Sequence, residues 1–556
     1  MTTSATSSAT LAPDRSVLHR ASSGVSTRPR PSTSTDPRTI AQHPVTPRTR
    51  VGQWRGWTVL VAAAAMLAVG VVHARGMYTA PIRFDDEGTY AAQAHTLLTQ
   101  GPLAPYTYWY DHPPLGWMVL AGWMGTLGAL WDAPNLIGSG RQLMLVLDVL
   151  SVALVVLLAR RTGLARWVAG SAGLLYGLSP LALTYHRMLL LDNIATPLLL
   201  GALILAMSPT RRLSAALGSG MLLASAVLVK ETVLLMLPFV LWALWRSFTG
   251  TTRRMCVTVF GLGLVLPALL YPLFAVTKGE LTPGPGHVSL WQGVFFQLLG
   301  RQSSGSVLQA GSDAHAVVAG WLSIDPYLIA AASALVVPAL LIARLRPIAA
   351  ALLFAGVAIL RPGYLPVPYI VALVPFAALV VAGVPGALTA ALLRRLREPV
   401  SRSAWSLATR TASGVALAGL VTGLVIGVQD VRPHWYYGDV SLMHTNFDRP
   451  YLDSTAWLQA NVPKNATLLV DNVTWTSLLS AGYPQQNLIW FTKPNADQQV
   501  DRRVPNWQAI TYVVSSDIIR TSRQNGGTVK DALLHSRPVA RWGSGSHEIE
   551  IRKVGP

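Results

Sequence analysis

The sequence predicts a polytopic α-helical membrane protein that carries a small α/β domain at its C-terminus. Of its 556 residues, 51% are hydrophobic and only 12% are charged, which is about half the charged fraction of a typical soluble protein. Apolar runs long enough to cross a bilayer as helices recur from Trp57 to near residue 430. Beyond that point short apolar runs alternate with amphipathic stretches, a pattern typical of an α/β fold.

The N-terminal segment, residues 1–55, is rich in Ser, Thr, Pro and Arg and almost lacks large apolar residues. We expect it to be disordered and, because it is basic, to lie in the cytoplasm. The first apolar run begins near Trp57, too far along the chain for a cleaved signal peptide. The net charge of +19 arises from arginines gathered between alternate apolar runs. It therefore indicates topology by the positive-inside rule and no nucleic-acid partner.

The membrane domain, residues 56–430, contains about eleven predicted transmembrane helices. With the N-terminus in the cytoplasm, an odd number of spans places the C-terminus outside the cytoplasmic membrane. A long external loop, residues 75–137, follows the first span. The predicted spans lie near residues 57–74, 138–160, 167–185, 190–208, 213–229, 232–247, 255–276, 326–343, 348–360, 364–384 and 411–429.

Two external stretches predict helices on the membrane surface. In the first external loop, apolar residues recur at helical spacing from Tyr90 to Leu98. Pro113-Pro114 in the same loop suits the first turn of another short helix. An aromatic-rich stretch at residues 287–300 lies in a later external loop. Helices from two loops could therefore roof a cavity over the bundle.

The C-terminal segment, residues 431–556, predicts an extracytoplasmic α/β domain of ordinary size. Residues 467–475 and 509–517 each contain a short apolar run that ends in a polar turn, as buried strands do. Residues 451–463 have an amphipathic pattern that closes on Asn-Val-Pro, as at the end of a helix.

Three consecutive acids, Asp85, Asp86 and Glu87, precede the predicted surface helix at the membrane edge, where charge is costly. Three interpretations remain open from the residues alone. The acids could cap the helix, bind a metal ion together with Asp111 and Asp192, or supply a catalytic base. Adjacent acids repel one another and burial disfavours the ionised form, so both effects raise the pKa of Asp86 toward the range that a general base needs.

These acids belong to an ordered set of motifs. Asp86, Glu87 and Tyr90 form "DExxY", and residues 110–115 read "YDHPPL". Together they resemble the first external loop of the GT-C glycosyltransferases, in the branch of the aminoarabinose–lipid A transferases and the protein O-mannosyltransferases. Three later stretches resemble that family in the same order: "HRMLLLDNIATPLL" (186–199), "VLVKETVLLMLPFVLWALW" (227–245) and "RPGYLPVPYIVALVPFAALV" (361–380).

The resemblance implies a GT-C-like fold and an inverting transfer of sugar from a polyprenyl-phosphate carrier. The acceptor would be a hydroxyl of an envelope glycan, lipid or protein at the outer face of the cytoplasmic membrane. Such a hydroxyl needs a carboxylate to take its proton, and the leaving phosphate needs cations or hydrogen-bond donors. By the resemblance Asp86 is the general base, and Asp111 is a second catalytic position. The branch implies no required cofactor or metal, with a divalent cation as the alternative.

Further residues are assigned to the substrates, and structural roles stay open for several of them. His112 stands where the family usually has Lys, so we expect a different donor preference. Lys230 could instead pair with Glu231, Arg187 could pair with Asp192, and Arg361 with Tyr364 could anchor at the interface. The predicted donor-phosphate residues are Lys230, Arg187, Arg361, Tyr364 and His112, and the predicted substrate-binding residues are Asp85, Glu87, Trp109, Tyr110 and Asp192.

Two other functional classes remain open. A transporter or flippase for lipid-linked glycans would place its charges near mid-bilayer, whereas these acids lie in an external loop, and no pair of broken helices is evident. A non-catalytic envelope scaffold would use the loop acids as caps. We expect the enzyme. The bias for Arg over Lys indicates GC-rich coding; with the basic N-terminus it suggests an actinobacterial enzyme whose donors carry mannose or arabinose.

Overall fold

The computed structural model describes residues 49–555 except 102–105, 107–109, 129–132, 210–211, 285–286, 399–403 and 523–524. Contacts divide the chain into two units, Met1–Gly52 and Gln53–Pro556. The second unit contains the helical bundle and the C-terminal sheet. Most of the predicted disordered segment 1–55 lies outside the described residues, and so does Trp109.

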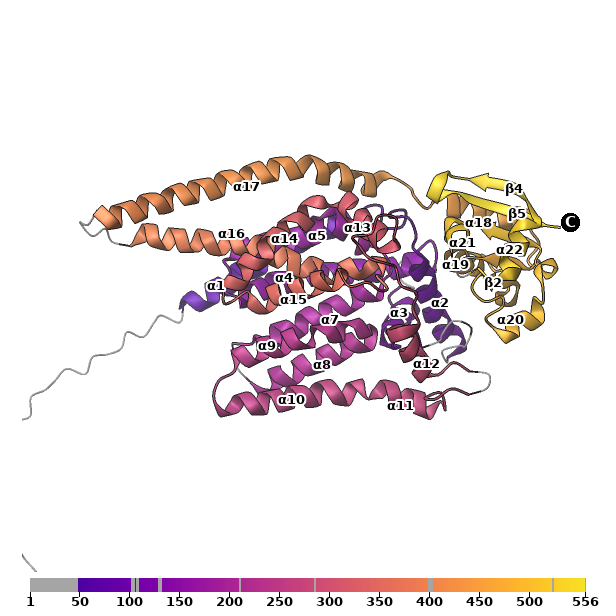
Figure 1. The fold of residues 1–556 in the computed structure, drawn as a ribbon, viewed down its shortest axis with the longest axis horizontal. Coiled ribbons are helices and arrows are strands. Elements are labelled where there is room, and N and C mark those ends of the chain that lie inside the picture. Colours follow the sequence, from indigo (N-terminus) through magenta and orange to yellow (C-terminus); the bar gives the residue numbers. More distant parts are fainter. Residues whose placement is uncertain are drawn as a thin grey trace, which may run out of the picture. The chain divides into compact units, whose positions relative to one another are not determined.

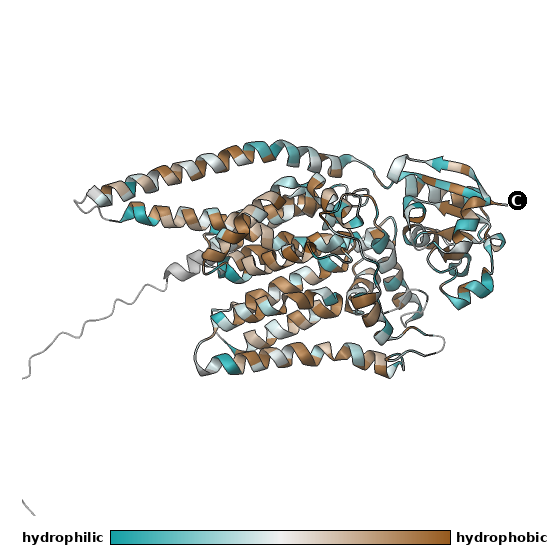
Figure 2. Cartoon of the chain, viewed as in Figure 1, coloured by the Kyte–Doolittle hydropathy of each residue, from teal (hydrophilic) through white to brown (hydrophobic). Residues whose placement is uncertain are grey.

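Apolar helices between residues 49 and 444 form a bundle in which most helices run side by side (Figure 1). Hydrophobic residues dominate these helices, whereas hydrophilic and hydrophobic residues are mixed in the C-terminal part (Figure 2). The helices of this part are α1 (Thr49–Ala74), α4 (Leu136–Arg161), α5 (Arg166–Leu178), α6 (Pro180–Tyr185), α7 (Leu191–Ala206), α8 (Leu213–Val229), η1 (Glu231–Met236), α9 (Leu237–Ser247), α10 (Thr251–Ala268), α11 (Leu270–Thr277), α13 (Asp313–Ile324), α14 (Pro326–Leu341), α15 (Arg346–Ile359), η3 (Val367–Ala372), α16 (Val374–Arg397) and α17 (Ala404–His444).

Each of the predicted spans overlaps one of these helices, but the predicted count of about eleven is not confirmed. Within the described part of the chain, 5 helices are long and apolar enough to cross a membrane, or up to 6 if a bent pair counts as one span. Helices α3 (Leu115–Gly125), α7, α8 and α15 are apolar but shorter. The five long segments are Gly56–Ala74, Leu136–Arg161, Thr252–Thr277, Val367–Arg397 and Trp405–Asn461.

The bent pair consists of α13 and α14, which meet at an angle of 104°. Asp325 lies at the break, fully buried, and its Oδ1 accepts the backbone N–H of Leu328 at 3.0 Å. Pro326 then occupies the first turn of α14, where its missing N–H costs nothing. The expectation that no broken helix pair exists is therefore wrong.

Short external helices lie at one end of the bundle (Figure 1). The predicted surface helix is α2 (Asp85–Gln100), and the Pro-Pro pair precedes α3 (Leu115–Gly125). The aromatic stretch forms α12 (Leu290–Phe295), which continues as the π-helical turn η2 (Phe296–Gly300). The predicted helices in both external loops are thus confirmed.

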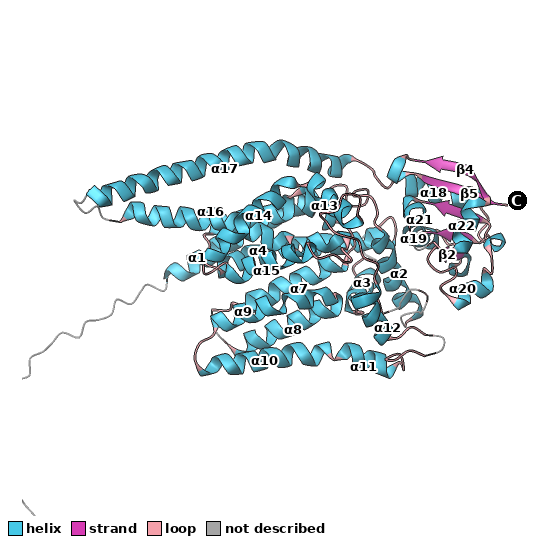
Figure 3. Ribbon diagram, in the orientation of Figure 1, coloured by secondary structure: helices cyan, strands magenta, loops and turns pink. Residues whose placement is uncertain are grey.

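The C-terminal α/β domain starts later than predicted, because α17 runs unbroken past residue 430 to His444. Strands are confined to this domain among the described residues (Figure 3). Its elements are α18 (Arg449–Asn461), β1 (Leu468–Val470), α19 (Asn472–Ser480), η4 (Gln485–Asn487), β2 (Leu488–Trp490), α20 (Gln498–Arg503), η5 (Trp507–Ala509), β3 (Tyr512–Ser515), α21 (Asp517–Thr521), α22 (Gly527–Leu534), β4 (Ser536–Trp542), η6 (Gly545–His547) and β5 (Ile549–Val554).

The five strands form one mixed sheet in the order β2-β1-β3-β5-β4. Strand β1 pairs in parallel with β2 and β3, and β5 is antiparallel to both β3 and β4. The predicted strand at 467–475 is shorter than expected. It ends at Val470 because Asp471 accepts the backbone N–H of Thr474 at 2.6 Å and so caps α19.

Candidate active site

The acidic turn begins helix α2 directly. Phe84 is the N-cap residue, and its backbone N–H donates to Glu87 Oε2 at 3.0 Å. Asp85 and Asp86 already lie within the first helical turn. The capping interpretation is therefore wrong for these two residues, although their charge still suits the positive end of the helix.

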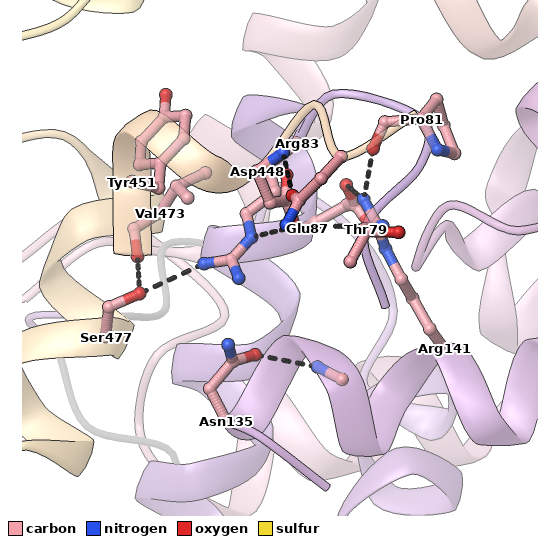
Figure 4. Close-up of polar contacts among 12 residues, drawn as sticks. Thr79, Pro81, Arg83, Glu87, Asn135, Arg141, Asp448, Tyr451, Val473 and Ser477 are labelled. Carbon is pink, nitrogen blue, oxygen red and sulfur yellow. Dashed lines mark hydrogen bonds and ion pairs between the residues drawn. The ribbon is translucent and has the colours of Figure 1, made fainter. Parts of the chain in front are cut away.

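Glu87 holds α2 against the bundle. Its carboxylate is fully buried and accepts hydrogen bonds from Nε and Nη2 of Arg141, each at 2.8 Å (Figure 4). It also accepts the backbone N–H of Leu189 at 2.9 Å. Burial alone would raise the pKa of Glu87, but Arg141 and the backbone donors hold it below the ordinary value. Because both oxygens are occupied by protein donors, the predicted role of Glu87 in substrate binding is corrected to a structural one.

Asp86 has the opposite environment. Among the residues that the structure describes, none donates a hydrogen bond to its carboxylate or forms an ion pair with it. Burial raises the pKa of Asp86, and the charges of Lys230, His112 and Arg301 offset part of that rise. The carboxylate is thus available to accept a proton from a bound hydroxyl.

Two ion pairs flank Asp86. Lys230 Nζ donates to Asp192 Oδ2 at 2.8 Å, and His112 Nδ1 lies 2.9 Å from Glu231 Oε2. Lys230 ends α8 in an extended conformation, so the chain turns there and Glu231 starts η1. The ion pair that Lys230 forms is thus with Asp192, although the charge of Glu231 also acts on Lys230. The assignments of Lys230 to the donor phosphate and of Asp192 to the substrate stay predictions.

Arg301 joins this group and was missed in the sequence. It follows the π-helical turn η2, its Nε donates to Gln297 Oε1 at 2.7 Å, and its guanidinium lies 4.4 Å from the ring centre of Tyr364. Tyr364 also feels the charges of Asp86 and Lys230. The sequence did contain a signal for Arg301, because it is the first cation after the aromatic stretch at residues 287–300 that was expected to roof the site. We call Asp86, His112, Asp192, Lys230 and Arg301 the Asp86 cluster.

The second acidic position, Asp111, lies on a constrained loop. Its neighbour Tyr110 adopts a left-handed backbone (φ 59°) and is almost wholly buried. The Tyr110 hydroxyl donates to Glu280 Oε2 at 2.6 Å. This side chain therefore anchors the loop, and the predicted role of Tyr110 in substrate binding stays a prediction. Burial raises the pKa of Asp111, while His112 and a hydrogen bond from Gln93 oppose the rise.

Asp85 lies on the side of α2 that meets the C-terminal domain. Its Oδ1 is buried and has no hydrogen-bond partner among the described residues. Burial, then the charges of Asp86 and Asp471, raise its pKa to about 8. A protonated Asp85 is thus expected at neutral pH. Its role in substrate binding stays a prediction.

Two predicted phosphate ligands lie elsewhere. Arg187 is buried, and its guanidinium donates to the backbone carbonyls of Leu442 at 2.8 Å and Val72 at 2.7 Å. It therefore ties α1 and α17 together, and the predicted phosphate contact and the alternative pair with Asp192 are both corrected. Arg361 is exposed, and its charge acts on the Tyr369 hydroxyl rather than on the Asp86 carboxylate.

The metal interpretation finds no assembled site. Within the described residues no three His, Cys, Asp or Glu side chains have a geometry that could hold a metal ion. Asp192 is engaged by Lys230, and the charges of Asp86 and Asp471 act on Asp85. The divalent cation stays an untested alternative.

An apolar hollow reaches one member of the Asp86 cluster. It lies among α7, η1, α15, η3 and α16 and has a cavity volume of about 40 Å³. Asp192 and Thr232 line it together with apolar side chains such as Leu199, Leu200 and Met236. The Asp86 cluster therefore borders apolar space through Asp192.

The arrangement of the bundle and the C-terminal domain occurs in solved membrane proteins. The structure of ArnT from Cupriavidus metallidurans bound to undecaprenyl phosphate is similar with a TM-score of 0.50 and 17% identity, over 90% of this chain and 99% of that one. The Archaeoglobus fulgidus oligosaccharyltransferase in complex with Zn and sulfate gives a TM-score of 0.52 at 12% identity, over 86% of this chain and 72% of that one. The chain has the GT-C fold.

The similarity to these proteins lies in the fold rather than in the sequence. No protein-family model matches the chain, and no curated protein sequence matches it. The expected GT-C-like fold is confirmed, and so is the small sheet at the C-terminus. The likeness extends along nearly the whole of ArnT.

Proposed function

We propose that the protein is an inverting glycosyltransferase that moves a sugar from a polyprenyl-phosphate donor to a hydroxyl of a cell-envelope glycan, lipid or protein. The observation that carries this proposal is the Asp86 carboxylate, which accepts no hydrogen bond from the described residues and lies near the charges of Lys230, His112 and Arg301. Asp192 of the same cluster lines an apolar hollow. ArnT, the fold neighbour, was solved with undecaprenyl phosphate bound. The reaction takes place at the outer face of the cytoplasmic membrane, with the N-terminus inside and the C-terminal domain outside.

The chemistry follows from the charges. Asp86 takes the proton of the acceptor hydroxyl while the hydroxyl oxygen attacks the anomeric carbon from the face opposite the phosphate. The bond between that carbon and the phosphate oxygen breaks, and the electron pair leaves with the polyprenyl phosphate. Lys230, Arg301 and the Tyr364 hydroxyl stabilise the growing negative charge. One displacement inverts the anomeric centre and needs no covalent intermediate, metal or cofactor.

Asp111 and His112 complete the proposed site from the other side of α2. His112, which stands where the family usually has Lys, contacts Glu231 Oε2 through Nδ1 at 2.9 Å. Asp111 is suited to hold a sugar hydroxyl, because its carboxylate is fixed by Gln93 close to Tyr90. Mannose and arabinose on polyprenyl phosphate are the first donors to test.

The experiment uses the full chain in nanodiscs, with radiolabelled polyprenyl-phosphate mannose or arabinose and an envelope extract as acceptor. Asp86→Asn is expected to lower kcat by about 10²- to 10⁴-fold, the usual contribution of a general base, with retained binding of undecaprenyl phosphate. Asp453→Asn, an exposed acid on α18, is the matched control and should transfer at the wild-type rate. Transfer by Asp86→Asn at the wild-type rate would remove Asp86 as the base.

The bent α13–α14 pair favours one alternative, a transporter of lipid-linked glycans, because broken helices often surround transport sites. The same preparation separates the two functions. A transporter reconstituted in liposomes moves labelled glycolipid between leaflets without forming a new glycosidic bond. A glycosyltransferase yields labelled acceptor and free polyprenyl phosphate.

A further inference from the structure

The C-terminal domain contacts the catalytic helix two residues beyond Asp86. Gly88 of α2 faces the start of α19 so closely that a Cβ added there would lie 2.4 Å from the Asn472 carbonyl carbon and 2.5 Å from the Val473 nitrogen. Both obstacles are backbone atoms, which cannot swing aside. Asn472 Nδ2 also donates to Thr89 Oγ1 at 2.7 Å. Helix α19 is therefore seated on α2 at a position that only glycine permits.

A buried charge cluster also holds the first turn of α2. It consists of Arg83, Glu87, Arg141 and Asp448. Arg83 Nε donates to Asp448 Oδ2 at 2.7 Å, and Nη1 donates to Ser477 of α19 at 3.1 Å (Figure 4). Arg141, which holds Glu87, lies 4.0 Å from the same Asp448 oxygen. Two positive and two negative charges balance in a site without water contact, so removal of one leaves an uncompensated charge.

A third contact reaches the loop that carries Asp111. The Tyr106 hydroxyl accepts the backbone N–H of Trp490 at 2.9 Å and donates to the Leu488 carbonyl at 3.4 Å, so it covers the free edge of strand β2. Lys493, almost wholly buried, lies 4.9 Å from the Tyr106 ring centre. The charge of Lys493 acts on Asp111. The domain thus contacts both elements that present the site's acids.

We propose that the C-terminal domain is a positioning element of the active site: α19 seated on Gly88, and Asp448 paired with Arg83, hold the first turn of α2 so that the Asp86 carboxylate is aimed at the acceptor. This inference rests on the proposed glycosyltransferase function. Gly88, Arg83 and Asp448 are positioning residues, because none of them belongs to the Asp86 cluster. A shift of about 1 Å in a catalytic group can cost about 10²-fold in rate.

The test is Gly88→Ala in the full chain in nanodiscs, beside Gly122→Ala as the matched control. Gly122 lies in the neighbouring external helix α3, and a Cβ there would meet no atom within 4 Å. We expect Gly88→Ala to lower kcat by roughly 10- to 100-fold while KM for the polyprenyl-phosphate donor stays within about threefold. Hydrogen exchange should rise in peptides that cover α2 and α19. Gly122→Ala should change none of these.

A second variant pair keeps the test sharp if Gly88→Ala fails to fold. Asp448→Asn should lower kcat. Arg83→Met combined with Asp448→Asn should recover part of the loss, because both charges of the ion pair are then removed and neither is left uncompensated. Wild-type kcat in Gly88→Ala, or unchanged exchange in α2, overturns the proposal. If wild-type protein transfers no sugar, the proposed function fails on its own, and the exchange result alone then decides whether the domain holds α2.

Discussion

Two clusters of charge start from the same turn of α2 and have opposite character. In the buried charge cluster every ionised side chain has a partner of opposite charge, and Arg141 occupies both oxygens of Glu87. In the Asp86 cluster the carboxylate has cations nearby but accepts no hydrogen bond from the described residues. Consecutive residues on a helix point about 100° apart, so one acid faces the bundle and its neighbour faces the site. A satisfied carboxylate stabilises the fold, whereas an unsatisfied one can react.

The largest expected effect tests the structural side of this comparison. Glu87→Gln removes the charge that balances Arg141, and breaking a buried ion pair from one side costs about 3–5 kcal/mol. We expect the free energy of unfolding to fall by that amount, measured by thermal or denaturant unfolding in nanodiscs. Asp86→Asn, the same chemical change one residue earlier, should leave that free energy equal or higher. A reversal of the two results would break the comparison.

The next effect concerns the cations. Lys230→Met removes a positive charge from beside the leaving phosphate, and loss of one such stabilising group typically lowers kcat by about 10²- to 10³-fold. Lys530→Met, an exposed lysine on α22, is the control and should leave kcat unchanged. Steady-state kinetics with saturating donor measure the difference. An effect confined to KM would mean that Lys230 binds the donor equally in the ground and transition states.

The pH dependence of kcat should shift in opposite directions when one or the other partner of the Lys230–Asp192 ion pair is replaced. Burial raises the pKa of Asp86, so kcat should rise with pH through an acidic limb that lies above the ordinary aspartate range. Lys230 lowers this pKa and Asp192 raises it. Lys230→Met should therefore shift the limb to higher pH, and Asp192→Asn to lower pH, each by roughly one unit. Shifts in the same direction would exclude Asp86 as the titrating base.

Local sequence patterns predicted the elements of this site but not its final membership. The helices of the external loops and the strands near 468 and 512 follow from periodicity and turn residues over a few positions. Glu87 faces the bundle and Asp86 faces the site because of the way α2 is rotated about its axis against the bundle. No local sequence pattern determines that rotation. Arg301 stands over Tyr364, more than sixty positions away in the chain, only because the turn η2 directs it there.

The predicted span count of about eleven stays unconfirmed for a related physical reason. Hydropathy measures how well a run of residues dissolves in a bilayer, whereas α7 and α8 are short apolar helices that pack against each other. Arg187 illustrates the same limit, because an arginine at a helix corner can bind phosphate or backbone carbonyls with equal chemistry. Here the carbonyls of Val72 and Leu442 occupy it. Only the three-dimensional arrangement decides between such partners.

The smallest expected effect concerns Asp85, which directly precedes Asp86 on α2. Its pKa is raised to about 8 by burial and by Asp86 and Asp471, so the folded protein keeps a proton that the unfolded chain releases above its ordinary value. Stability should therefore decline as pH rises from about 4 toward 8. Asp85→Asn removes this penalty without removing the side chain's shape. Its melting temperature should exceed that of the wild type by a few degrees at pH 8 and match it at pH 4. An Asp85→Asn variant that is less stable at pH 8 would show that the ionised carboxylate has a partner in the folded state, which would place Asp85 with Glu87 among the satisfied acids.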